Sequence, residues 1–435
     1  MVGGTTIVLR AVGPQDIYLF GNPQITHFKA VYRRHTNFAK EYKKIVKSGG
    51  ESINFGSTLE YLIASEGDLL GELFLSVKIK ATSSSATSHT INHFGNSLLK
   101  SVEFQLGGMK IDKHISQWFQ VYKELYSNVY EYDDRDKESD STNGGKTTAF
   151  YTGAGTSQLP VESDRVEGDC ALNFAAGTYT KQMYIPLRFF FNNHIGLALP
   201  LIALTRQEKK IIIELETSAN LQGSSNISSM TLSSFELIGQ FYILDTNEKV
   251  RFRDSAHEYL IETLKYQEET THATNQTEKT YDLNDFKHPT KFITWVITNP
   301  GDAGSNAGRG PNYFVSMCNN SYRYDDGTEG TFQILLNGDI KNSRTDMSVY
   351  TRYNLKKYCK HTSAFMDRIG MYSFAINPLD YEPSGSCNFS KLNNKQIKIL
   401  PYNRDYSITS EKIYIFAVTY NILSMNGGMG GKLYD

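Results

Sequence analysis

Residues 207–213, QEKKIII, decide the fold, because residues 393–399, NNKQIKI, repeat their pattern later in the chain. Each stretch begins with polar residues and ends in isoleucines, as a run in 211–213 and in alternation with Lys398 in 397–399, which is typical of a strand. The two stretches lie 397 − 211 = 186 positions apart. A repeat at this distance indicates a β domain that was duplicated and fused.

Three further pairs of segments recur in the same order. Met183-Tyr184 returns as Met371-Tyr372, at an offset of 371 − 183 = 188. Leu106-Gly107-Gly108 and Leu336-Asn337-Gly338 each sit in a strand-turn-strand pattern. Residues 241–244 (FYIL) resemble 420–423 (YNIL). We therefore predict an all-β chain of two similar Greek-key sandwiches.

The local patterns give the expected elements. Residues 69–79 predict a strand, and residues 101–111 and 333–341 predict hairpins. Gly108 is expected at a turn position that needs a positive φ, because two-residue hairpin turns require it. Residues 118–125 have apolar side chains at helical spacing and predict a short helix on a loop.

The order of polar and apolar stretches gives the domain organisation. Residues 1–24, rich in Gly and Pro, predict an N-terminal arm, and the alternation from Phe28 to Tyr32 predicts the first strand. The first sandwich is placed at 25–245, with a long polar loop at 132–178. Charge rises around 245–254, so the second sandwich is placed at 246–424, followed by a Gly-rich C-terminal tail at 425–435.

Composition excludes several classes of protein. Forty-five Lys and Arg balance 46 Asp and Glu, so bulk charge gives no support for coating nucleic acid. The four cysteines are far apart and form no CxxC pair, which favours a reducing compartment: Cys170, Cys318, Cys359 and Cys387. The chain opens without the pattern of a secretory signal, and its most apolar stretch, 195–204, is about half the length of a membrane span, so we expect a soluble protein.

Several segments together resemble one family. They are 15–19 (QDIYL), 21–26 (GNPQIT), 28–34 (FKAVYRR), 189–192 (FFFN), 196–204 (GLALPLIAL), 257–262 (HEYLIE), 288–291 (HPTK), 383–390 (PSGSCNFS) and 427–431 (GGMGG). In this order, over nearly the whole chain, they resemble the major capsid proteins of nucleocytoplasmic large DNA viruses. The loops 132–178 and 299–330 depart from the lengths expected for smaller members, which affects the outer surface and not the wall.

The resemblance implies a double jelly roll, two tandem eight-stranded jelly rolls with long surface loops and a few short helices. It implies a homotrimer that forms a pseudo-hexagonal capsomer of an icosahedral shell, located in the virion and assembled in the host cytoplasm. Its expected partners are itself, neighbouring capsomers, minor capsid or penton proteins and inner viral membrane components, with no direct binding to the genome. The arm is expected to serve assembly through Gln15, Asp16, Gly21, Asn22, Pro23, Arg33 and Arg34.

A binding module is the alternative. A tandem jelly-roll protein that binds carbohydrate, or a receptor-binding penton or spike component, would concentrate aromatic and acidic residues in its loops. Tyr130, Tyr132 and Tyr151 lie near Asp133 and Asp134 and keep this alternative open.

The sequence predicts no catalytic, cofactor or metal site. Residues 427–432 end in Lys432 but lack the Ser or Thr of a phosphate loop. His89 and His93 lie in a Ser/Thr-rich loop where solvent exposure is the better explanation, and Cys387 has no obvious histidine partner. Glu268-Glu269 reads as solvated charge in a polar stretch.

Two surface features complete the list of candidates. The basic cluster 32–35 (YRRH) with Lys40, Lys43 and Lys44 is interpreted as solvated or ion-paired, because Glu41 interrupts it. Sequons occur at Asn226, Asn275, Asn319 and Asn388, but in a cytosolic protein the secretory machinery does not meet them.

Overall fold

The computed structural model describes residues 11–49, 53–84, 88–91, 94–126, 173–174, 176–222, 227–270, 278–298, 312, 314, 317, 330–342, 345–359, 368–400 and 412–434. The chain separates into two units, Met1–Asn37 and Phe38–Asp435. In the first unit, the described residues form only η1 (Pro14–Asp16) and α2 (Ile17–Phe20).

The prediction of a strand from Phe28 to Tyr32 is wrong. Phe28 lies in a turn and Lys29 in a bend, residues 30–37 form no helix or strand, and the first strand is β1 (Phe38–Ile45). Alternation alone cannot make a strand when no neighbouring strand supplies hydrogen bonds. Residues 25–37, assigned from the sequence to the first sandwich, therefore carry no strand.

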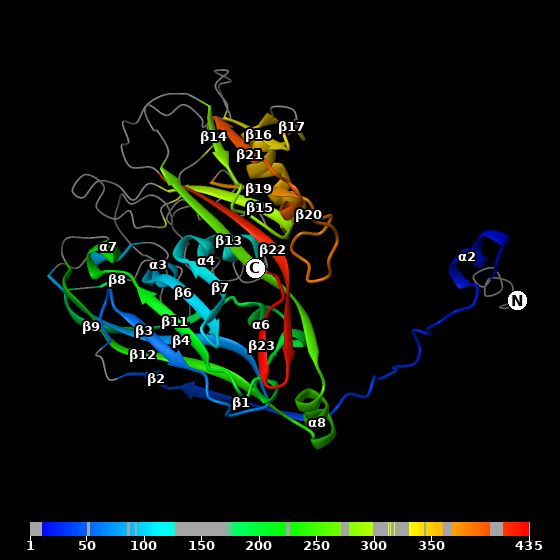
Figure 1. The fold of residues 1–435 in the computed structure, drawn as a ribbon, viewed down its shortest axis with the longest axis horizontal. Coiled ribbons are helices and arrows are strands. Elements are labelled where there is room, and N and C mark those ends of the chain that lie inside the picture. Colours follow the sequence, from blue (N-terminus) through cyan, green and yellow to red (C-terminus); the bar gives the residue numbers. More distant parts are fainter. Residues whose placement is uncertain are drawn as a thin grey trace, which may run out of the picture. The chain divides into compact units, whose positions relative to one another are not determined.

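The second unit contains two jelly rolls, and Figure 1 shows them as two lobes. In the first, sheet 1 has the order β1, β12 (Ile227–Leu244), β4 (Leu69–Ser83), β10 (Leu199–Pro200), with β9 (Gly177–Pro186) also on β4. Sheet 2 has the order β2 (Lys47–Ser48), β3 (Thr58–Leu62), β11 (Lys209–Leu215), β6 (Leu99–Leu106), β7 (Met109–Ile115). A short pair, β5 (Ser88–His89) and β8 (Asn173–Phe174), lies outside them.

The second jelly roll repeats this order. Sheet 3 runs β13 (His257–Thr270), β22 (Lys412–Asn426), β15 (Pro289–Thr298), β19 (Ile369–Ser373), with β20 (Cys387–Asn388) on β15. Sheet 4 runs β14 (Lys279–Asp282), β21 (Lys395–Leu400), β16 (Thr331–Leu336), β17 (Asp339–Ile340), with β18 (Thr345–Asp346) on β16. All these pairings are antiparallel, and the equivalent order confirms the duplicated fold.

Short helices fill the connections. The first jelly roll has α3 (Phe94–Leu98), α4 (Ser116–Tyr126), α6 (Phe190–Asn193), η3 (Ile195–Leu197), η4 (Leu201–Ala203) and α7 (Ser218–Leu221). The second has η5 (Val349–Tyr353), α9 (Asn354–Tyr358) and η6 (Phe389–Lys391). Helix α8 (Thr246–Asp254) connects the last strand of the first jelly roll to β13.

The stretches that predicted the duplication occupy equivalent strands. Ile211 and Ile213 of β11 and Ile397 and Ile399 of β21 are buried in their respective cores. The hairpin turns match as well, with φ of 56° and 82° at Gly107-Gly108 and of 55° and 85° at Asn337-Gly338. Two successive positive φ values are the requirement of a type I′ turn, so the position predicted for Gly108 is confirmed.

The predicted equivalence of Met183-Tyr184 with Met371-Tyr372 is wrong by one residue. Met183 of β9 packs in the core of the first jelly roll. Met371 of β19 lies instead on the opposite face of its sheet, and its neighbour Tyr372 contacts the core of the second jelly roll. Because side chains alternate along a strand, a shift of one residue reverses the face.

The predicted C-terminal tail is also corrected. Residues 429–432 form β23 (Met429–Lys432), which pairs with β22 through a turn at Gly427-Gly428. The hairpin lies against the first jelly roll, where the Arg206 backbone N–H donates to the Gly428 carbonyl (2.9 Å) and the Gly430 N–H donates to Gln207 Oε1 (2.7 Å). The Gly residues therefore form a β turn and a contact between the two jelly rolls.

Candidate assembly site

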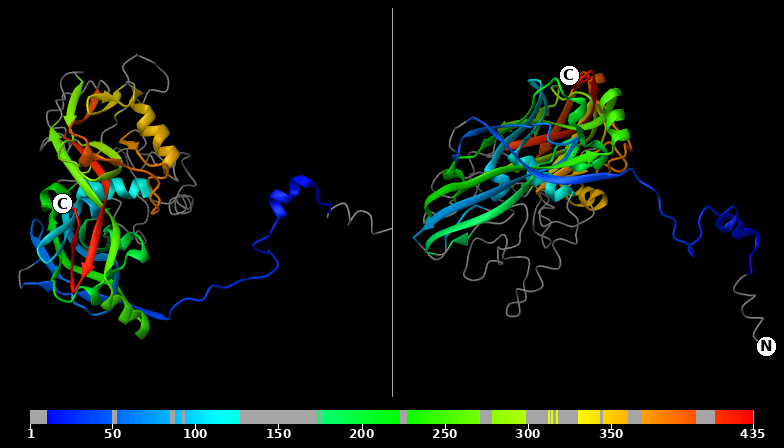
Figure 2. Two further views of the ribbon diagram at one scale, coloured as in Figure 1. Left: turned by 45° about the vertical axis from the view of Figure 1, so that its right-hand side comes forward. Right: turned by 90° about the horizontal axis from the view of Figure 1, so that it is seen from below.

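Helix α4 joins the two jelly rolls and is buried, contrary to the expectation of a helix on a loop. Figures 1 and 2 show it in cyan between the lobes. Trp118 is 3% exposed, and its ring lies 5.4 Å from that of Phe416 on sheet 3. Val121 and Leu125 belong to the same apolar cluster. The helix thus fastens the first jelly roll to the outer face of sheet 3.

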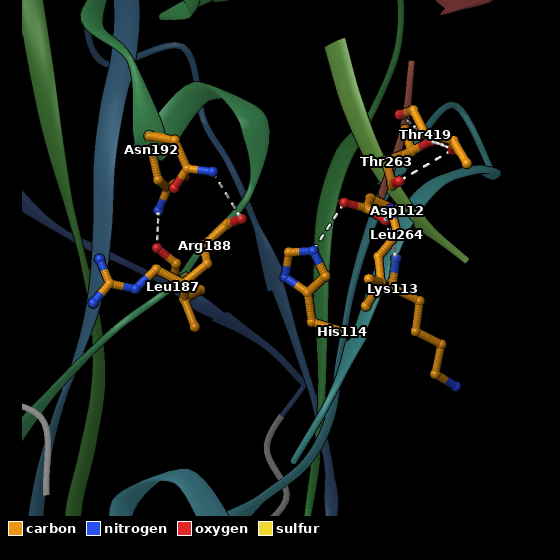
Figure 3. Close-up of polar contacts among 10 residues, drawn as sticks. Asp112, Lys113, His114, Leu187, Arg188, Asn192, Thr263, Leu264 and Thr419 are labelled. Carbon is orange, nitrogen blue, oxygen red and sulfur yellow. Dashed lines mark hydrogen bonds and ion pairs between the residues drawn. The ribbon is translucent and has the colours of Figure 1, made fainter. Parts of the chain in front are cut away.

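A buried carboxylate reinforces this junction. Asp112 of β7 is 3% exposed and accepts hydrogen bonds from the backbone N–H groups of Lys113 and Leu264, each at 3.0 Å, and Leu264 belongs to the second jelly roll. His114 Nε2 lies 2.9 Å from the other carboxylate oxygen, and because a carboxylate only accepts, we assign the proton of this contact to Nε2 (Figure 3). Three donors satisfy a charge that burial would otherwise penalise strongly.

The imidazole of His114 has little choice of orientation. Its ring stacks on Phe189 with centroids 5.0 Å apart, and Phe119 approaches its edge at 5.9 Å. Among the described residues, Nδ1 of His114 has no hydrogen-bond partner. The ring packing therefore fixes the imidazole with Nε2 toward Asp112.

A second charged group lies at the same end of sheet 3. Lys291 is 1% exposed, and its ammonium forms an ion pair with Glu262 and donates to the Asp380 carbonyl (2.7 Å). Burial raises the pKa of Glu262, while Lys291 opposes that shift. Nearby, Tyr381 of the second jelly roll stacks on His194 of the first, with centroids 4.2 Å apart.

The duplication extends to two buried lysines. Lys209 Nζ donates to the Leu204 carbonyl (3.0 Å), just after η4, and Lys395 Nζ donates to the Leu392 carbonyl (3.0 Å), just after η6. Burial lowers the pKa of both ammonium groups. The strand-starting lysine of each jelly roll therefore caps the preceding turn.

The arm residues proposed from the sequence lie together on the first unit. Gln15 and Asp16 belong to η1, and Asp16 Oδ2 accepts from the Gly13 N–H (2.7 Å). Gly21 ends α2 by donating to the Ile17 carbonyl (2.8 Å), and Asn22 has a φ of 52°. Pro23, Arg33 and Arg34 are exposed.

The arm also exposes large apolar side chains. Ile17, Tyr18, Leu19 and Phe20 are 60–93% exposed, and Phe28 is 100% exposed. Exposed apolar surface of this extent is a common feature of interaction sites. The structure brings the predicted arm residues onto one unit but does not join them into a pocket.

The other candidates divide by where they lie. Several candidates lie outside the described residues: Asn226, Asn275, Asn319, His93, Cys170, Cys318 and nearly all of the loop 132–178. The side chain of His89 is not described. Asn388 is exposed, and its Oδ1 accepts from the Ser390 N–H (3.0 Å). Glu268 accepts from Lys412, and Glu269 pairs with Lys279 at 3.5 Å.

Among the described residues, the basic cluster, Cys359 and Cys387 form no assembled site. Lys43 pairs with Glu41 (3.3 Å) and Lys44 with Glu236 (2.8 Å). Burial raises the pKa of the Cys359 thiol to about 12, and it raises that of Cys387 as well. Within the part of the chain that the structure describes, no cluster of three or more His, Cys, Asp or Glu could hold a metal ion. Among the described helices, none has the length and apolar character needed to cross a membrane.

Sequence reasoning missed Asp112, His114 and the two lysines. The lysines were detectable, because Lys209 and Lys395 stand at the same place in the two repeated stretches. Asp112 carries no comparable signal, since its partner Leu264 lies 152 residues away and contributes only a backbone N–H.

Comparisons with known proteins agree with this geometry. The profile described as "Major capsid protein N-terminus" matches residues 26–239, and "Large eukaryotic DNA virus major capsid protein" matches residues 248–431. The chain is 33% identical to the major capsid protein of Pyramimonas orientalis virus and 30% identical to that of Paramecium bursaria Chlorella virus 1, over the full length of each.

Solved structures give the same fold. A chain of the PBCV-1 virus capsid superposes with a TM-score of 0.73 at 27% identity, covering 94% of this chain and 100% of the other. The Faustovirus major capsid protein has a TM-score of 0.66 at 13% identity, covering 96% of this chain and 95% of its own, and shows the fold alone. Full-length identity, both family profiles and the double jelly roll converge, and the chain belongs to the major capsid proteins of large eukaryotic DNA viruses.

Proposed function

We propose that three copies of this chain form a pseudo-hexagonal capsomer that tiles an icosahedral shell. The observation that carries the proposal is the duplicated jelly roll with its buried internal junction. Three chains with two similar lobes each present six similar walls, as six-fold tiling requires. The contacts are heterologous and close into a ring, which is a common symmetric solution for oligomers.

The proposal assigns no catalytic role to the chain. We divide the chain into an arm (1–24), a first jelly roll (25–245), a second jelly roll (246–424) and a C-terminal segment (425–435). The first strand begins at Phe38, and strands β22 and β23 extend into the C-terminal segment. The chain would act in the virion after assembly in the host cytoplasm. Its partners would be other copies of itself, minor capsid or penton proteins and inner viral membrane components.

The arm supplies the second part of the proposal. Its exposed apolar residues and its basic pair Arg33-Arg34 suit contact with a neighbouring capsomer or an inner shell protein. The residues Gln15, Asp16, Gly21, Asn22 and Pro23 shape this segment through the turns described above. The glycosylation sequons are assigned no role in the shell.

Mass measurement and imaging test the capsomer. Light scattering of the purified chain should give about three times 49.1 kDa, and electron microscopy should show hexagonal particles. A stable monomer across mild salt conditions would contradict the proposal. Glycan binding by that monomer would instead support a carbohydrate-binding or receptor-binding role.

A further inference from the structure

The outer face of sheet 1 carries a row of aromatic side chains. Tyr42 of β1 and Tyr184 of β9 are 53% and 42% exposed, and the ring of Phe74 lies between them with centroid distances of 6.0 and 6.2 Å. Gln240 Nε2 donates to the Tyr42 hydroxyl (2.7 Å), and Gln182 Nε2 donates to the Tyr184 hydroxyl (2.8 Å). Ordered, half-exposed tyrosines of this kind are typical of protein interfaces.

The equivalent face of sheet 3 is buried within the chain. Tyr184 pairs with Ser76 on β4, and Met371 pairs with Thr294 on β15, so strand register makes Tyr184 and Met371 equivalent. Met371 is fully buried, whereas Tyr184 is 42% exposed. The two faces have the same place in the fold and opposite solvent exposure.

Helix α4 contributes to this difference, as do Leu355 and Cys359, which belong to the same buried cluster. The helix places Trp118, Val121, Tyr122 and Leu125 against sheet 3, a stripe at i, i+3, i+4 and i+7. Trp118 contacts Phe416 of β22, which pairs with Thr294 of β15. On sheet 1, Glu236 of β12 pairs with Ser76 of β4 in the same way, so Glu236 holds the position equivalent to Phe416. Among the described residues, sheet 1 has no such helix over it.

The second jelly roll contains the equivalent of α4. Both α4 and η5–α9 follow the hairpin of their jelly roll, and each sends one aromatic residue, Phe119 or Tyr350, into its own core. The offset is 350 − 119 = 231. It maps the α4 stripe onto residues 349, 352, 353 and 356. Val349 packs against the core of its own jelly roll and Arg352 is half-buried, so Tyr353, which is 65% exposed, and Lys356 form the exposed part of the stripe.

We propose that η5–α9 of one copy covers the outer face of sheet 1 on the next copy, with Tyr353 against the row formed by Tyr42, Phe74 and Tyr184. Around the capsomer, the α4 contact within a chain alternates with the η5–α9 contact between chains. This inference rests on the proposed trimer and specifies its interface.

The chemistry of the two faces suits this difference. On sheet 1, Lys44 and Glu236 form an ion pair at the positions that Leu264 and Phe416 occupy on sheet 3. A face that is exposed until assembly needs polar groups for solubility, whereas a face buried during folding does not. The aromatic row with its polar neighbours therefore fits a second copy of this chain.

Substitutions of Tyr184 on β9 and Tyr353 on η5 test the interface, with Tyr179 on β9 as the matched control. Tyr184→Glu should lower the trimer fraction at least tenfold in sedimentation, and Tyr353→Glu should do the same. Tyr179→Glu is the control, because Tyr179 lies on the same strand and is equally exposed at 41%, but its position along the strand is off the outer-face row. Intact trimers of both Tyr184→Glu and Tyr353→Glu would overturn the proposed interface.

Cross-linking of the unmodified protein provides a test that is independent of folding. Trimers assembled from a mixture of ¹⁵N-labelled and unlabelled chains should give lysine cross-links of mixed isotope between Lys44 and Lys356 or Lys357. Two results would overturn the interface without contradicting the capsomer. One is cross-links within one chain only; the other is cross-links from Lys44 to Lys29 of the arm with none to Lys356 or Lys357. A wild-type chain that stays monomeric would overturn both the interface and the capsomer.

Discussion

At the scale of single residues, the hairpin turn at Gly108 sets a backbone requirement. Its φ is 82°, and a Cβ atom added there would meet nothing within 4 Å, so only the backbone resists substitution. Gly108→Val should lower the free energy of unfolding by about 1–3 kcal/mol. Gly108→Asn should cost less, since Asn tolerates a positive φ better than Val does; Asn337 adopts a φ of 55° at the first position of the second turn, next to Gly338. Equal melting temperatures for the Val variant and the wild type would reject this turn assignment.

Asp112 gives the second prediction at this scale. Asp112→Ala leaves the Leu264 N–H and His114 without their acceptor in a buried site, so we expect a loss of about 2–4 kcal/mol. A double-mutant cycle with His114→Leu separates the two contacts, because the cost of Asp112→Ala should shrink when His114 is already absent. Fully additive losses in chemical denaturation would show that the Asp112–His114 contact contributes nothing.

At the scale of elements, helix α4 should decide whether the two jelly rolls act as one body. Trp118→Ala removes a buried ring between α4 and Phe416, and we expect a loss of about 3–5 kcal/mol, with Trp118→Phe retaining most of the stability. Because the junction weakens first, protease sensitivity near α8 should rise in the Ala variant. A single unfolding transition with wild-type stability would contradict this role for α4.

The elements also show what the sequence could predict. Strands β11 and β21 were predictable because alternation and repetition are local and recur at a fixed distance. The burial of α4 was not, since Phe416, the partner of Trp118, lies 416 − 118 = 298 residues further along the chain. The prediction of a strand at Phe28 was wrong for a related reason, because pairing with a neighbouring strand, and not alternation, makes a strand. Interfaces depend on such distant partners, so the arm residues could be proposed but not placed against a surface.

At the scale of the whole molecule, buried tyrosines should set an alkaline limit to stability. Burial raises the pKa of Tyr259 to about 12, and that of Tyr61, Tyr414 and Tyr420 also rises. Each raised pKa means that above pH 10 the unfolded chain loses a proton that the folded chain keeps, so stability present below pH 10 is lost as pH rises. Lys209 and Lys395, with lowered pKa, act in the opposite direction but are only two groups. The free energy of unfolding, measured by urea denaturation from pH 9 to 11.5, should fall; a flat profile would contradict this prediction.

The arm gives the last prediction, because it is a unit separate from residues 38–435 and carries exposed apolar side chains. Removing residues 1–37 takes away no described strand, so the truncated chain should fold and form trimers with wild-type melting temperature. Shell assembly should fail, since the apolar surface of α2 would no longer bind a neighbour. Phe20→Asp with Leu19→Asp in the full-length chain is the matched control and should reproduce the assembly defect without shortening the chain. Sedimentation reports the trimer and electron microscopy the shells. Loss of the trimer on truncation would place the arm inside the capsomer, whereas normal shells would remove it from assembly altogether.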